Sequence, residues 1–149
     1  MKALERFSPE DRERIKQAIG KAEMQTSGEI RVYIDDECKE DVMDQAAFVF
    51  AELNMHRTEL RNGVLIYLAV EDHKFAIIGD AGIHAKVGDQ FWNKIKAEMI
   101  LRFKDGKVTE ALEVAILEAG EQLKHFFPRS NDDKNELPDD MVFGKGGKS

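Results

Sequence analysis

The chain has 149 residues, 34% of them charged, and its net charge is −7. Acidic and basic residues are interspersed, so we do not expect the clustered basic surface that nucleic-acid binding requires. The length fits one domain that buries about 70% of its unfolded surface, and the single cysteine excludes an internal disulfide and a cysteine-rich metal site. No apolar run approaches the roughly 18 residues of a membrane span, and the N-terminus lacks a signal-peptide core, so the sequence predicts a cytoplasmic protein without a membrane span.

The first elements predicted along the chain are a helix, a strand and a second helix. Ser8 and Pro9 are typical of a helix start, and the apolar stripe that follows them ends near Gln25. Residues 29–36 alternate between apolar and polar side chains, which predicts a strand with one more polar face. Residues 41–54 carry a second apolar stripe at helical spacing.

Two apolar segments joined by a short polar turn are the most informative feature of the sequence. Residues 63–70 and 74–79 are apolar at consecutive positions, whereas a half-exposed strand alternates. We therefore expect a hairpin buried on both faces at the centre of a sheet. The strand–helix–strand order before it makes the first two strands parallel. The sequence thus predicts an α/β fold, a three-layer α/β/α sandwich with a small mixed sheet (strands about 29–36, 63–70 and 74–79) and about four helices.

Two further helices are predicted after the hairpin. Gly88 and Asp89 mark the start of the first, with Asp89 as its N-cap, and Gly106 marks its end. The second runs from about 108 to 126. Gly120 lies inside it, where a close approach to another helix would explain a residue of low helix propensity.

The chain is expected to divide into a domain and a tail. Residues 1–128 contain all of the periodic segments and should form one α/β/α domain. Residues 129–149 are rich in charge, Asn, Pro and Gly, which predicts a mostly disordered polar tail. Four apolar residues of that tail could still dock on the domain: Leu137, Met141, Val142 and Phe143.

Polar residues gather at the end of the sheet where the third strand finishes. The loops near 26–29, 57–63 and 79–89 should meet there, because the open ends of a hairpin lie side by side and a parallel neighbour starts at the same edge. Oxygen ligands bind Ca²⁺ and Mg²⁺, and glycines let a ligand approach the backbone. We therefore predict a polar cleft with Ca²⁺ or Mg²⁺ as its candidate cofactor. The expected cation ligands are Glu29, Asp80 and Asp89, and the expected ligand-binding residues are Arg57, Asn62, Gly63 and Gly82.

The same residues also fit a purely structural interpretation. Asn-Gly and Asp-Ala-Gly are ordinary turn sequences, Asp89 is an ordinary helix cap, and Arg57 is an ordinary partner for an acid. If the cation site exists, its carboxylates repel one another when it is empty. If the cation site exists, Asp80→Asn should therefore raise the melting temperature of the cation-free protein, because it removes one of the repelling charges.

The chain resembles the TPM domain family at these residues. The matching parts are residues 27–32, 62–67 and 78–83, Asp89 and the final amphipathic helix. The resemblance covers about residues 8–128 and is greatest to a short bacterial subgroup, which shares the motif at 135–139.

Membership of this family would carry expectations about fold and activity. The family, which includes a plant thylakoid acid phosphatase-like protein, a photosystem II repair protein and a nematode receptor modulator, has an α/β/α sandwich fold. Acid phosphatase-like hydrolysis is known for some members and divalent-cation binding for others, and many are extracytoplasmic domains tethered to a membrane. This chain differs from the longer members in having Arg61 in place of an acid and Gly-Asp-Ala-Gly at 79–82 in place of Gly-Tyr-Gly.

Two functional hypotheses follow. The first is a soluble TPM-like domain that acts as a non-catalytic binding or accessory module with a candidate divalent-cation site, and it is favoured because no recognisable nucleophile or base occurs in the sequence. The alternative is a metal-dependent, acid phosphatase-like phosphomonoesterase, in which the cation polarises the phosphoryl oxygens and Arg57 binds the phosphate. The expected partner is a protein, which could be membrane-associated, or a phosphorylated small molecule, and the chain is expected to be a monomer.

Overall fold

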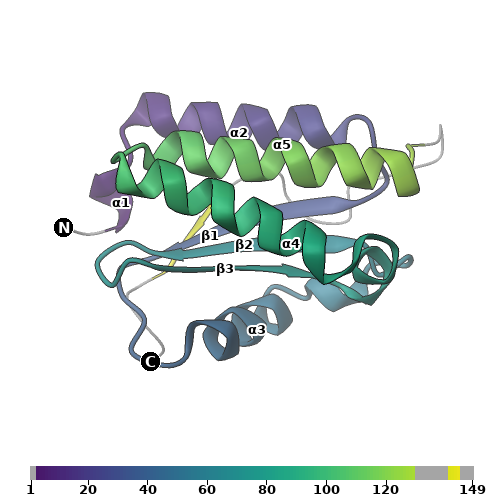
Figure 1. Ribbon diagram of the computed structural model, residues 1–149, viewed down its shortest axis with the longest axis horizontal. Helices are drawn as coiled ribbons and strands as arrows, with labels where there is room; N and C mark the ends of the chain where they lie inside the picture. The colour runs from purple at the N-terminus through teal and green to yellow at the C-terminus, as the bar shows by residue number, and fades with distance from the viewer. Residues whose placement is uncertain (1–2, 130–140, 145–149) are drawn as a thin grey trace.

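The computed structural model describes residues 3–129 and 141–144 of the chain, with helices and strands in alternating layers (Figure 1). A capping box at Ser8 begins the long N-terminal helix, and Asp41 caps the helix that follows the first strand. The elements in chain order are α1 (Ala3–Arg6), α2 (Pro9–Glu23), β1 (Glu29–Asp35), α3 (Val42–Glu52), the 3-10 turn η1 (Met55–Arg57), β2 (Gly63–Ala69), β3 (Lys74–Gly79), α4 (Ala81–Lys104), α5 (Val108–Phe126) and β4 (Val142–Phe143).

The strands form a mixed sheet in the order β3-β2-β1-β4. β1 runs parallel to β2, from the pair Glu29 and Gly63 to the pair Asp35 and Ala69. β2 and β3 form the antiparallel hairpin. The predicted fold class and its mixed sheet are confirmed, and the three predicted strands lie within one residue of their observed bounds.

β2 is buried along its whole length, and its two faces belong to two different cores. Figure 1 shows α2, α4 and α5 over one face of the sheet and α3 against the other. The larger core takes Val64, Ile66 and Leu68 from β2. The smaller core, on the α3 side, takes Leu65, Tyr67 and Ala69. Apolar side chains at consecutive positions of one strand therefore require helices on both faces.

The helix start predicted at residues 88–89 lies inside α4, where the second of two helical segments begins. Residues 81–87 are already helical, and Asp80 is the N-cap, with its side chain accepting a hydrogen bond from the amide of Ala81. Gly88 interrupts the helix with a φ of 74°, a conformation that favours glycine. A helical segment does start after Gly88, as predicted, but the expected N-cap at Asp89 is wrong, because Asp89 already has helical backbone angles.

Gly120 lies at a close crossing of α2 and α5. A Cβ atom at this position would stand 2.7 Å from the Cβ of Ala22 on α2. The absence of a side chain lets the two helices approach, which offsets the low helix propensity of glycine.

Part of the predicted tail adds a strand to the sheet. Val142 and Phe143 pair in parallel with Tyr33 and Ile34 of β1, and the ring of Phe143 meets that of Phe7 edge to face. Met141 packs in the larger core. Residues 130–140, which include Leu137, and residues 145–149 lie outside the described residues.

Docking of this strand should contribute measurably to stability. Met141 is 7% exposed, whereas Met24 is 74% exposed. We expect Met141→Ala to lower the free energy of unfolding by about 2 kcal/mol, or roughly 5 °C in melting temperature, because the substitution leaves a cavity. Met24→Ala is the matched control and should change the melting temperature little. Equal melting temperatures for the two variants would show that residues 141–144 do not dock in solution.

A half-buried acidic pair, Glu98 and Glu118, lies between α4 and α5. The pKa of Glu118 is raised from its ordinary value near 4.5 to about 7, first by burial and then by the hydrogen bond and the negative charge of Glu98. Lys94 and Arg102 oppose the shift. The folded protein therefore favours the protonated form of Glu118.

This shift predicts a pH dependence of stability. Because the folded state holds the proton more tightly than the unfolded state, the contribution is fully present below pH 4.5 and is lost as the pH rises through about 7. We expect Glu118→Gln to flatten the melting temperature between pH 5 and pH 8, roughly the titration range of this group. Glu121→Gln, at an exposed position of the same helix, should leave the profile of the wild type unchanged. A profile that keeps its slope in Glu118→Gln would assign the pH dependence to other groups.

Candidate functional site

The open end of the hairpin brings several of the predicted residues together. Gly63 pairs with Glu29 in the sheet, and its carbonyl oxygen accepts a 2.9 Å hydrogen bond from the amide of Asp80. The carbonyl oxygen of Asn62 accepts a hydrogen bond from the amide of Glu29 at 3.4 Å. The topology therefore places these four residues at one end of the sheet.

The carboxylate of Asp80 is occupied by an arginine. Arg61 donates two hydrogen bonds to it, from Nε at 2.7 Å and from Nη2 at 2.8 Å. This bidentate geometry is the strong form of an arginine–carboxylate pair. The hydrogen bond and the charge of Asp80 raise the pKa of Arg61. The Asp80 side chain is only 6% exposed, so the pair partly shields it from water.

The same loop covers the N-terminus of α4. The carbonyl oxygen of Arg61 accepts hydrogen bonds from the amides of Gly82 at 2.8 Å and Ile83 at 3.3 Å, while Asp80 Oδ1 accepts one from Ala81. A Cβ atom at Gly82 would lie 2.2 Å from the carbonyl oxygen of Leu60. Amides that could otherwise hold an anion at a helix N-terminus thus bind the protein's own backbone.

The remaining predicted residues differ in exposure. Asn62 is buried and donates from its side chain to Ser27 Oγ at 3.3 Å. Arg57 is exposed on η1. The side chain of Asp89 is 88% exposed, and its carboxylate lies 3.5 Å from His84 Nε2.

Across the part of the chain that the structure describes, no three His, Cys, Asp or Glu side chains form a group that could hold a metal ion. A cation site at Glu29, Asp80 and Asp89 stays a prediction. Its most buried carboxylates are those of Glu29 and Asp80, whereas Asp89 lies beyond the kink of α4 and is open to solvent.

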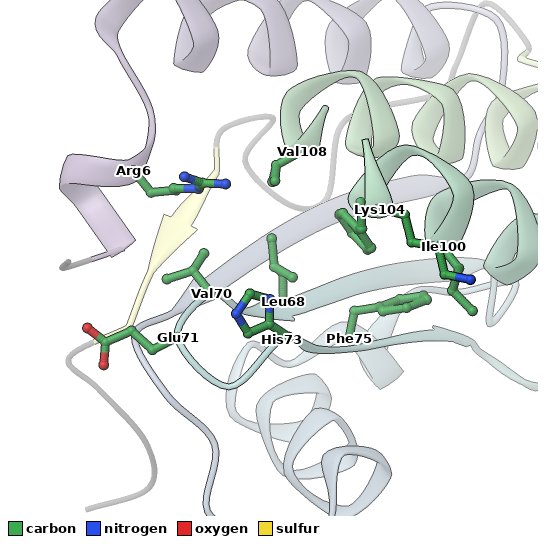
Figure 2. A pocket seen from close by; sticks show the side chains of 10 residues that line it. Arg6, Leu68, Val70, Glu71, His73, Phe75, Ile100, Lys104 and Val108 are labelled. Atoms are coloured by element: carbon green, nitrogen blue, oxygen red, sulfur yellow. The ribbon is translucent and has the colours of Figure 1, made fainter. Parts of the chain in front are cut away.

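A cavity of about 570 Å³ opens at the opposite end of the sheet (Figure 2). It lies where the β2–β3 turn meets the C-terminus of α4 and the N-terminus of α5. The aromatic rings of Phe75 and Phe103 contact each other edge to face in its wall, with centroids 5.1 Å apart. The apolar lining consists of Leu68, Val70, Phe75, Ile100, Phe103 and Val108.

The rim of this cavity is polar. His73 stands in the β2–β3 turn with a φ of 52°, so its backbone is in the left-handed conformation and its imidazole lies beside the cavity (Figure 2). The charged rim residues are Arg6 on α1, Glu71 in the turn and Lys104 on α4. Sequence reasoning missed this site, although the polar turn at 71–73 and the helix end at 104–106 were both visible in the sequence.

Comparison with known families gives a match over most of the chain. Residues 3–122 match the TPM domain. The chain belongs to the TPM domain family. The resemblance seen in the sequence is therefore confirmed.

A solved structure supports the same assignment for this TPM domain protein. The NMR structure of the BA42 protein from the psychrophilic bacterium Bizionia argentinensis is similar, with 43% sequence identity and a TM-score of 0.86 over 93% of this chain and 95% of that one. Comparison with functionally curated proteins finds no match. Within residues 3–129 and 141–144, every helix is too short or too polar to cross a bilayer.

The Arg61–Asp80 pair reverses the stability effect expected for Asp80→Asn. Asparagine caps a helix about as well as aspartate, so this substitution removes the charge of the pair and keeps the cap. We expect Asp80→Asn to lower the melting temperature of the cation-free protein. Asp89→Asn, which changes an exposed carboxylate in the same way, should leave it nearly unchanged. A higher melting temperature for Asp80→Asn would mean that carboxylate repulsion dominates at this end of the sheet.

Proposed function

We propose that this TPM domain protein is a non-catalytic binding module whose ligand occupies the cavity between the β2–β3 turn and the α4–α5 junction. The observation that carries the proposal is the cavity itself. Its volume of about 570 Å³ falls within the range of small-molecule sites, which is roughly 300–1,000 Å³. An apolar wall with a few polar groups at the mouth is the usual composition of such sites.

The contacts at the polar end of the sheet, where Asn62, Gly63 and Asp80 meet, favour a structural role for these residues over a binding role. Arg61 and Asp80 bind each other, Asn62 binds Ser27, and the first amides of α4 bind the loop before β2. A ligand there would have to replace contacts that the fold already makes. A ligand in the cavity at the other end would instead cover apolar side chains that already face open space.

Divalent-cation binding, with the phosphomonoesterase activity that it would allow, is the second candidate. It is favoured by two nearly buried carboxylates, those of Glu29 and Asp80, on either side of Gly63. A cation on Asp80 would compete with Arg61. Millimolar Ca²⁺ or Mg²⁺ would then raise the melting temperature beyond the effect of matched ionic strength, more strongly in Arg61→Gln and not at all in Asp80→Asn.

The test of the cavity uses a neutral apolar probe. We expect 1-octanol to shift the amide NMR signals of Leu68, Val70 and Phe75 and the methyl signals of Leu68 and Val70, with saturation, because it replaces water against the apolar wall. Val108→Phe should weaken this binding about tenfold by filling the cavity. Val114→Phe makes the same change on α5 outside the cavity and should bind octanol like the wild type.

Shifts scattered over the surface, or equal binding by Val108→Phe and the wild type, would contradict a binding function at this cavity. A saturating cation effect of the kind described above, without octanol binding, would move the function to the polar end of the sheet.

A further inference from the structure

We infer that the cavity binds a small amphipathic monoanion, with its aliphatic body against the apolar wall and its carboxylate at Arg6; this inference rests on the proposed binding function. The two basic residues come from α1 and α4, on different sides of the cavity mouth. In Figure 2 the ammonium of Lys104 lies beside Ile100, across the apolar wall from the guanidinium of Arg6. A single carboxylate is therefore assigned to Arg6, from which it would accept charge-assisted hydrogen bonds.

Both basic side chains are available for such a ligand. Neither Arg6 nor Lys104 forms an ion pair with another residue of 3–129 or 141–144. Figure 2 shows the guanidinium of Arg6 directed into the cavity from α1. A basic group that points toward an apolar wall without a carboxylate partner is the arrangement that an anionic headgroup completes.

The acidic residues nearby do not neutralise these two groups. Glu71 is the one acid among the lining residues, and its carboxylate points away from the cavity in Figure 2. A second, polar hollow adjoins the cavity at Arg6 and Val108 and contains two more acids. Asp11 lies 3.9 Å from Arg14, and Glu110 lies 3.2 Å from Arg102, so each has its own basic neighbour.

The apolar wall sets the other half of the ligand. Leu68, Val70 and Phe75 form its floor on the hairpin, and Ile100 and Phe103 form one side on α4. Ile100 is 41% exposed and adjoins the other apolar lining residues, so its exposed surface is continuous with the wall. An aliphatic chain that covers this surface would gain free energy in proportion to the area that it buries.

The experiment compares three probes that share one chain and differ in charge: octanoate, 1-octanol and octylammonium. Each is titrated into the full chain at pH 7 and followed by NMR shifts of the lining residues. We expect octanoate to bind about tenfold more tightly than octanol, and octylammonium to bind most weakly. Butyrate, with the same charge and a shorter chain, should bind more weakly than octanoate.

Charge-neutral variants locate the headgroup. Arg6→Gln should weaken octanoate binding about three- to tenfold and leave octanol binding unchanged, because only the carboxylate contacts Arg6. Lys104→Gln removes a charge on the far side of the wall and should weaken octanoate binding less than Arg6→Gln does. The matched controls are Arg57→Gln, at the other end of the sheet, and Lys86→Gln, at the other end of α4. Both controls are exposed and should bind octanoate like the wild type.

The outcomes separate the ligand class from the proposed function. Equal affinities for octanoate and octanol, or tightest binding of octylammonium, would overturn the anionic ligand while leaving a binding cavity in place. Octanoate binding that Arg6→Gln leaves unchanged, or that Lys104→Gln weakens more, would overturn the assigned headgroup position. A failure of all three probes to shift the lining residues would overturn the proposed function itself.

Discussion

The burial of β2 on both faces is the constraint on which the rest of the structure depends. Its backbone is hydrogen-bonded to β1 on one side and β3 on the other, and its side chains fill two separate cores. A strand in this position can be shielded from water only if helices cover both faces of the sheet. Chemistry that needs polar groups must therefore be built at the two ends of the sheet, where loops and turns meet.

The two ends are closed in different ways. At the open end of the hairpin, backbone and side chains of the loop before β2 reach the start of α4, and Arg61 contributes both its carbonyl oxygen and its guanidinium. At the other end, the β2–β3 turn and the α4–α5 junction face each other through side chains, with a cavity of about 570 Å³ between them. Dense backbone hydrogen bonding leaves little room for a ligand, whereas facing side chains do not exclude one.

The strands could be predicted from the sequence because apolar residues at consecutive positions have few other interpretations. The convergence of Asn62 and Asp80 followed from topology alone. The partner of Asp80 could not be predicted, because it depends on the left-handed backbone of Arg61, with a φ of 53°, which turns that side chain toward α4. The cavity depends on how far the side chains of α4 reach over the hairpin, which periodicity does not encode.

α4 connects the two ends, since it begins at the Arg61–Asp80 pair and finishes in the cavity wall at Ile100 and Lys104. The segment of α4 after the kink at Gly88, from Asp89 to Ile100, alone spans roughly 16 Å at 1.5 Å per residue, and Asp80 lies on the other side of that kink. Along that segment Trp92, Ile95 and Met99 are buried in the larger core and hold the helix independently of its N-terminus. Substitutions this far apart and without shared partners act additively on stability. Loss of the Arg61–Asp80 pair should therefore lower stability while leaving the cavity intact, and a change in ligand binding after substitution at Arg6 or Lys104 reports on the cavity alone.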